Sequence, residues 1–140
     1  MEYAIRPSDD GRYVILEMVG EVTIPEVMQA LVESHSMGGR LGVRCFLVDA
    51  TAARNNELAL SNFKFAQDDI PDMPAIDKLA CIASLVEPAD HSHDFFEAAT
   101  RGAGYDFTIF RDRGLAIEHL HRAADRFDRL QRHAGDPAKG

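Results

Sequence analysis

Two short, almost purely apolar segments constrain the fold of this chain most. One is CFLV within VRCFLVDA, and the other is the near-continuous run within DKLACIASLV. Successive side chains of a strand point to opposite faces, so both segments are predicted to be strands with both faces covered. Segments with helical periodicity alternate with them. This alternation predicts parallel strands joined by right-handed helical crossovers.

The chain begins with a predicted antiparallel hairpin. EYAIRP and RYVILEMVG are separated by SDDG, in which Asp10-Gly11 has the chemistry of a turn that tolerates positive φ. In the second run Val14, Leu16 and Met18 alternate with Tyr13, Ile15 and Glu17. This pattern predicts a strand with one drier face.

The clearest predicted helix is TIPEVMQALVESHSMGGR. Thr23 and Glu26 have the spacing of a capping box, and Gly38-Gly39 is expected to end the helix. His35 lies in the last turn, where we expect it to bond helix carbonyls. The apolar stripe has helical spacing and consists of Ile24, Val27, Met28, Leu31 and Val32.

The rest of the chain completes one α/β domain with a mixed sheet and the element order ββαβαβαβα, with helices packed against the sheet. NNELALSNFKFAQDD is a predicted helix that Pro71 and Pro74 stop, DHSHDFFEAATRG is a short helix, and YDFTIF is a half-covered or edge strand. The domain is expected to span residues 1–130, and residues 131–140 form a flexible tail. A long final helix, RGLAIEHLHRAADRFDRLQRH, has an apolar side formed by Leu120, Ala123, Ala124, Phe127 and Leu130.

Composition argues against two classes of partner. The net charge is −8 and the pI about 5.1, so there is no surplus of Lys and Arg to bind nucleic acid or an anionic membrane. No segment is apolar enough to span a membrane, and MEYAIRPSDD has no apolar signal-peptide core, so we expect a cytoplasmic protein. Cys45 and Cys81 lie in apolar runs and are expected to be core residues, not a disulfide.

The stretch RCFLVDATAARNN raises the question of chemistry at a strand end. Asp49 and Thr51 follow an apolar run, and ligands of open α/β sheets bind beyond the carboxyl ends of strands. The pair could supply a phosphoacceptor, a general base or a partner contact. The preferred interpretation is an Asx turn, in which the carboxylate accepts from backbone N–H groups just downstream.

Evidence for a metal site or a nucleophile is weak in the sequence. HSHD offers His91, His93 and Asp94, but His91 and His93 are two apart and face different ways on a helix. The preferred interpretation is a helix start with Asp90 as N-cap. His119 and His121 have the same spacing, and no Gly-x-Ser-x-Gly elbow is present. We therefore predict no metal, no cofactor and no catalytic residue.

An acidic segment around two prolines also lacks a binding pattern. It lacks the regular oxygen spacing and the turn glycine of a calcium loop. We expect a solvated loop. Its acidic residues are Asp68, Asp69, Asp72 and Asp77.

Several stretches resemble the SpoIIAA-like family, which is related to the STAS anti-sigma-factor antagonists and to the Sec14-like lipid-binding fold. They are FLVDAT, KLACIAS and FFEAATRGAGYDFTIFRDRGLAIEHL, and the likeness covers residues 1–121. The resemblance implies a small mixed sheet flanked by helices in a bacterial protein, often a dimer, with no established enzymatic role. STAS antagonists carry Asp-Ser-(Ser/Thr)-Gly after the strand matching CFLVDA. Here the region reads TAARNNELALSNF, so the phosphoserine switch is absent, and Thr51 and Ser61 are the nearest hydroxyls.

Three functions follow as hypotheses, each compatible with a homodimer to which the helix from Gly114 to Leu130 could contribute. The leading one is a non-catalytic binding or regulatory module with a partner surface at Asp49, Thr51, Arg54, Asn55, Asn56 and Ser61. The alternative is a small apolar, lipid-like ligand in a pocket lined by Phe63, Phe65, Phe95, Phe96 and Phe107, although core packing is the preferred role for these rings. The third is a metal-assisted hydrolase that uses His91, His93 and Asp94.

Overall fold

The protein is built around a five-stranded mixed sheet. The computed structural model describes residues 1–56, 61, 64, 67–68 and 76–134. The strands lie side by side in chain order; the first pair is antiparallel and the other three pairs are parallel. They are β1 (Glu2–Pro7), β2 (Val14–Val22), β3 (Cys45–Asn55), β4 (Cys81–Leu85) and β5 (Asp106–Phe110). The predicted hairpin, mixed sheet and edge position of YDFTIF are confirmed.

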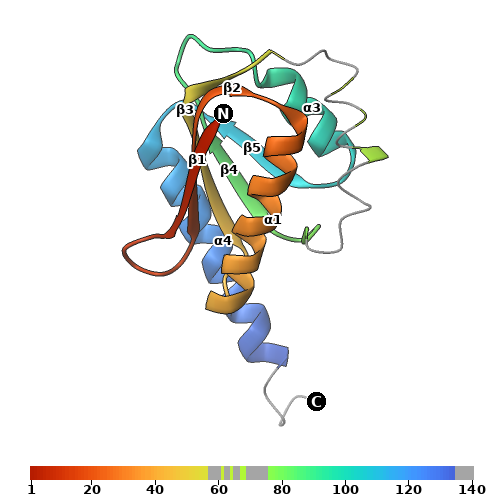
Figure 1. Ribbon diagram of the computed structural model, residues 1–140. Coiled ribbons are helices and arrows are strands. Elements are labelled where there is room, and N and C mark those ends of the chain that lie inside the picture. Colours follow the sequence, from red (N-terminus) through yellow and green to blue (C-terminus); the bar gives the residue numbers. More distant parts are fainter. Residues whose placement is uncertain (57–60, 62–63, 65–66, 69–75, 135–140) are drawn as a thin grey trace.

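Helices cover both faces of this sheet (Figure 1). α1 (Ile24–Leu41) and α3 (Asp94–Gly102) pack on one face, and α4 (Arg113–Ala134) packs on the other. Most of the helix predicted for NNELALSNFKFAQDD lies outside the described residues. Within the described part of the chain, no helix combines the length and apolar character needed to cross a membrane.

The apolar strands divide their side chains between two clusters. Phe46 and Val48 of β3 face α1 and α3, whereas Cys45 and Leu47 face α4. β2 behaves in the same way, because Ile15 is buried on the α4 side. The predicted drier face of β2 is nevertheless confirmed. Val14, Leu16 and Met18 are all buried, whereas on the other face Glu17 is partly buried and Val19 is exposed. Ile15 is buried on that second face because α4 covers it there.

Both ends of α1 differ from the predicted form. The Thr23 hydroxyl donates to the Glu26 carboxylate at 2.6 Å instead of accepting from a backbone N–H, so the capping box is not formed. The helix continues to Leu41 and ends in a Schellman motif, with Gly42 at φ 69° and the Val43 N–H donating to the Gly38 carbonyl at 2.8 Å. Gly38 has another role, since a Cβ there would lie 2.8 Å from the Phe46 ring.

The later helices also begin or end at residues other than those predicted. α3 begins at Asp94 with His93 as its N-cap residue, and the Asp90 carboxylate accepts from the Ser92 N–H at 2.8 Å in the preceding turn. α4 continues to Ala134, so residues 131–134 of the predicted tail are helical, and residues 135–140 lie outside the described residues. Leu130 was expected on the apolar side of this helix but is 66% exposed, because it lies beyond the sheet-covering part of the helix.

β3 is longer than its neighbour β4 and forms a fork in the sheet. It pairs with β4 only as far as Asp49 opposite Leu85. A bulge follows, where Glu17 and Val19 of β2 face Asp49 and Ala52. Beyond the bulge β3 stays paired with β2 to its end. On the side where β4 has ended, two side chains contact the backbone of β3 in place of a neighbouring strand. The Ser92 hydroxyl accepts from the Asn55 N–H at 3.1 Å, and His93 Nε2 lies 3.0 Å from the Ala53 carbonyl.

Candidate functional site

Charged side chains from several separate segments meet at the carboxyl ends of the parallel strands. We define this region, towards the top of Figure 1, as the carboxyl edge. It is formed by Asp49, Thr51, Arg54, Asp90, His91, Asp94, Arg111 and Arg113. These residues come from β3, from the segment between β4 and α3 together with the first residue of α3, and from the β5–α4 junction. The topology thus gathers at one end of the sheet residues that are far apart in sequence.

Asp49 is held by three hydrogen bonds. Its Oδ1 accepts from the Thr51 N–H at 3.1 Å and from the Thr51 hydroxyl at 2.7 Å, and its Oδ2 accepts from the Arg113 guanidinium at 2.7 Å. Burial would raise the pKa of the Asp49 carboxyl, but these bonds outweigh burial and hold the pKa below its usual value. The predicted Asx interaction is therefore present. Arg113 is an additional cation, 64 residues away in sequence.

The expected position of Asp49 at the end of its strand is wrong. β3 runs on to Asn55, and Asp49 and Thr51 lie at the bulge, level with the end of β4. The polar sequence TAARNN has the composition of a loop, but Ala53 and Asn55 are buried and the segment pairs with β2. Asp49 thus lies level with the carboxyl end of β4, but in the middle of β3.

A second group of charges lies beside this bulge. Arg111 donates to the Asp94 carboxylate and to the Asp90 carbonyl, both at 3.1 Å, while Arg54 lies 4.0 Å from the Asp90 carboxylate. His91 Nδ1 is 2.8 Å from Asp94, and this hydrogen bond, followed by the bond from Arg111, lowers the pKa of the Asp94 carboxyl. Burial opposes ionisation of Asp90, yet bonds from Ser92 and nearby cations still lower its pKa. The edge therefore holds two groups of ion pairs, one around Asp49 and one around Asp90 and Asp94.

The histidine motif HSHD does not assemble into a three-ligand cluster. His91 is exposed and bonds Asp94, whereas the His93 ring is buried, with Nε2 3.0 Å from the Ala53 carbonyl and 3.6 Å from Asp90. The two rings thus serve different partners. The geometry required by the metal-assisted hydrolase hypothesis is absent from these described residues.

The six residues predicted as a partner surface divide between different environments. Arg54 and Asn56 are exposed, and the Asn56 amide donates to the Glu21 carboxylate at 3.2 Å. Asp49 and Thr51 are partly buried, and Ser61 is half-buried. Asn55 is buried and points to the other side of β3, towards an internal cavity. The exposed residues of the predicted surface are therefore Arg54 and Asn56, and Asn55 does not belong to it.

An apolar cavity of about 50 Å³ lies between α1, α3 and the sheet. Phe96 and Phe107 line it, with ring centroids 5.3 Å apart in an edge-on arrangement. Asn55, Ser84 and His93 supply its polar lining. Phe95 is exposed on α3 and does not line this cavity, and Phe63 and Phe65 lie outside the described residues.

At the opposite end of the sheet, Asp77 has a structural partner. The Arg44 guanidinium donates to both of its carboxylate oxygens, at 2.6 and 2.9 Å, and lies 5.0 Å from the Phe127 ring centroid. This ion pair lowers the pKa of the Asp77 carboxyl. Of the acidic residues expected in a solvated loop, Asp68 is exposed, and Asp69 and Asp72 lie outside the described residues. Asp77 itself is therefore an anchor rather than a free loop charge.

Comparison with known proteins adds a fold neighbour. No family model and no curated protein matches the chain. A solved structure is similar to it: the crystal structure of an uncharacterized protein from the DUF3478 family with a SpoIIAA-like fold, from Shewanella loihica PV-4. The two are 24% identical, the match covers 85% of this chain and 92% of the other, and the TM-score is 0.44.

Proposed function

We propose that this chain is a non-catalytic binding module that engages a protein partner through the carboxyl edge. The observation that carries this proposal is the convergence of three arginines on carboxylates at one end of the sheet. The pairs are Arg54 with Asp90, Arg111 with Asp94, and Arg113 with Asp49. The arginine side chains of these pairs are 33–68% exposed, so they remain accessible to a partner while they contact the carboxylates. Arginine is enriched at the energetic centres of protein interfaces.

Two exposed apolar side chains extend the same region. Phe95 is 46% exposed in the first turn of α3, and Leu115 is 57% exposed in the first turn of α4. Both helices begin at the carboxyl edge, because α3 follows β4 and α4 follows β5. Apolar anchors beside arginines suit a partner that presents a small apolar depression flanked by carboxylates.

The proposed binding does not depend on a phosphorylation switch. The Thr51 hydroxyl donates a hydrogen bond to the Asp49 carboxylate at 2.7 Å, and Thr51 is partly buried. A phosphate at Thr51 would bring negative charge against the Asp49 carboxylate. This arrangement agrees with the missing Asp-Ser sequence and favours constitutive recognition.

Site-directed photo-crosslinking tests this proposal. We expect a photoreactive phenylalanine analogue at position 95 or 115 to give one discrete protein adduct in cells of the source organism. The double substitution Arg54→Glu and Arg113→Glu should reduce that adduct at least tenfold, since it reverses the charges that the partner faces. Mass spectrometry of the adduct identifies the partner.

The matched control places the same analogue at Leu79, which is exposed just before β4, at the opposite end of the sheet. We expect no discrete adduct there. Equal adducts from position 79, or adducts that survive charge reversal in a folded variant, would contradict recognition at the carboxyl edge.

A small apolar ligand is the second candidate function. The observation in its favour is the cavity behind Phe96 and Phe107, which combines an apolar lining with a few convergent polar groups. Its volume of about 50 Å³ is well below the roughly 300 Å³ at which drug-sized pockets begin, so it suits a small group and not a whole lipid. Native mass spectrometry with added short-chain fatty acids separates the two candidates, since an unchanged protein mass would argue against the ligand.

Homodimerisation stays a prediction. The buried side of α4 lies against β3 and β4 of its own chain, so this side of the helix is already used within the protomer. Sedimentation analysis over a range of protein concentrations would determine the assembly state.

A further inference from the structure

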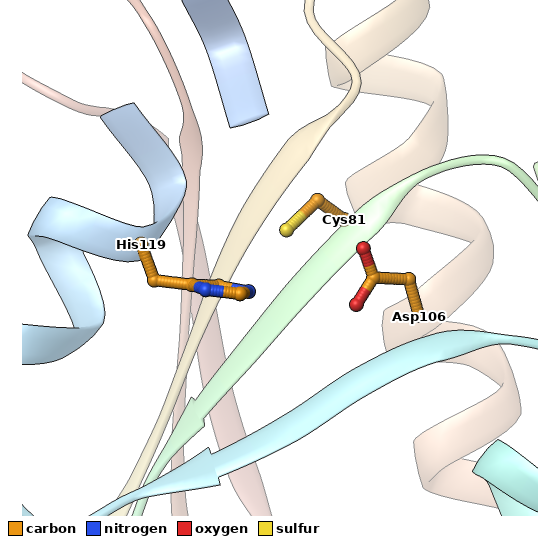
Figure 2. Close-up of side chains that lie close together, drawn as sticks. All are labelled: Cys81, Asp106 and His119. Atoms are coloured by element: carbon orange, nitrogen blue, oxygen red, sulfur yellow. The ribbon is translucent and has the colours of Figure 1, made fainter. Parts of the chain in front are cut away.

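We propose that Cys81, Asp106 and His119 form a binding site for a divalent transition metal of the Zn²⁺ class. The three side chains come from β4, β5 and α4 and converge on the sheet face that α4 covers (Figure 2). One ligand atom from each residue, the thiol sulfur, a carboxylate oxygen and an imidazole nitrogen, lies within 4.8 Å of the other two.

The sheet register fixes two of the three ligands. Cys81 and Asp106 are direct register partners at the first positions of β4 and β5, so their side chains emerge side by side on the same face. His119 reaches this face from the second turn of α4, one residue before the buried Leu120. Because strand pairing and helix packing position the ligands, the site is built on rigid elements.

The His119 imidazole has a buried nitrogen, Nε2, without a hydrogen-bond partner among the described residues. The ring packs against Phe110 with centroids 5.1 Å apart, which gives it an apolar neighbour but no hydrogen-bond partner. Buried polar atoms are usually satisfied, so a nitrogen of this kind beside a thiol and a carboxylate indicates a missing partner. A bound cation would supply one.

The donor set selects the class of ion. Thiolate, imidazole and carboxylate together suit Zn²⁺, whereas Ca²⁺ and Mg²⁺ require oxygen ligands. In a tetrahedral site with the usual zinc bond lengths, ligand atoms are about 3.3–3.8 Å apart. Shifts of about 1 Å in the positions of the ligand atoms would bring this cluster to that spacing. Three protein ligands leave a fourth position, and the exposed Asp106 provides access from solvent.

A role for Cys81 as a free nucleophile fits the site less well. The Cys81 side chain is fully buried, and burial followed by the charge of Asp106 raises its pKa to about 12. An unliganded thiol there is protonated and inert at neutral pH. A coordinated thiol loses its proton to the metal's charge, so the same burial is compatible with a ligand role.

Cobalt substitution provides the test, with protein freed of metal by a chelator. We expect Co²⁺ to bind with one ion per chain and to produce a thiolate-to-cobalt charge-transfer band and visible bands of tetrahedral intensity. Zn²⁺ should displace the cobalt and remove both signals. Cys81→Ser should abolish the charge-transfer band, and His119→Gln and Asp106→Asn should each weaken binding at least tenfold.

Cys45→Ser is the matched control. Cys45 is the register partner of Cys81 on β3, is equally buried, and does not belong to the three-ligand cluster. We expect this variant to keep the cobalt spectrum unchanged. The wild-type titration decides the question even if a variant fails to fold: absence of saturable binding of Co²⁺ or Zn²⁺ would overturn the proposal, as would a charge-transfer band that persists in Cys81→Ser. The site lies at the amino ends of β4 and β5, so this outcome is independent of recognition at the carboxyl edge.

Discussion

Replacement of Leu120 with alanine is expected to lower the free energy of unfolding by about 3 kcal/mol, within the roughly 2–5 kcal/mol typical of buried leucines. Leu120 is 0% exposed and packs between α4 and the sheet, in the cluster that contains Leu47 and Leu85. The fully or nearly fully buried residues closest to Leu120 on the helix are too small to fill the space that the substitution leaves. The other buried residues that α4 contributes are alanines: Ala116, Ala123 and Ala124.

Urea denaturation followed by circular dichroism measures this effect. Leu130→Ala is the matched control on the same helix, and we expect it to change stability by no more than about 0.5 kcal/mol because its side chain is exposed. If the two substitutions had equal effects, α4 would not pack on the sheet through Leu120, and the assignment of the α4 face would be wrong.

Replacement of Gly38 with alanine is expected to destabilise the protein by about 1–3 kcal/mol, the usual cost of overpacking. Within a helix the same change ordinarily stabilises by up to about 1 kcal/mol. Here the added Cβ would lie 2.8 Å from the Phe46 ring and 2.8 Å from the Val43 carbonyl oxygen. The ring is stacked on His35 with centroids 4.4 Å apart, and the carbonyl belongs to the backbone, so neither neighbour can move freely.

Gly39 offers a control one residue away. A Cβ at Gly39 would meet nothing within 4 Å, and its backbone is helical. Gly39→Ala should therefore stabilise the protein by about 0.5–1 kcal/mol. Thermal unfolding of both variants should give midpoints that shift in opposite directions. A stabilising effect of Gly38→Ala would show that α1 does not approach β3 as closely as described.

The fold was predictable where a local pattern determines it. The apolar runs around Leu47 and Ala83 predicted buried parallel strands, and the spacing from Val27 to Leu31 predicted α1. The errors occurred where tertiary contacts outweigh local preference. TAARNN has loop composition, yet β2 provides a partner that keeps it in the sheet. Asp90 has N-cap chemistry, but its carboxylate accepts from the Ser92 N–H in the turn that precedes the helix.

The candidate sites were less predictable because distant segments form them. Asp49 could be identified from its place after an apolar run, but its partner Arg113 lies 64 residues away. The Cys81, Asp106 and His119 cluster has no sequence spacing that a motif could describe. Only the register of β4 with β5 and the packing of α4 bring these ligands together. Conversely, HSHD has a suggestive composition, and the structure directs its two rings to different partners.

The fork in β3 gives one strand two levels of protection against amide hydrogen exchange. Residues 46–49 pair with strands on both sides, so their amides become accessible only when the sheet itself opens. The Asn55 amide depends instead on the Ser92 hydroxyl, and it is released whenever the segment before α3 moves away. An occupant of the carboxyl edge would slow exchange at Asn55 and leave exchange at Leu47 unchanged. Exchange at Leu47 therefore serves as an internal control against which exchange at Asn55 reports whether the carboxyl edge is occupied.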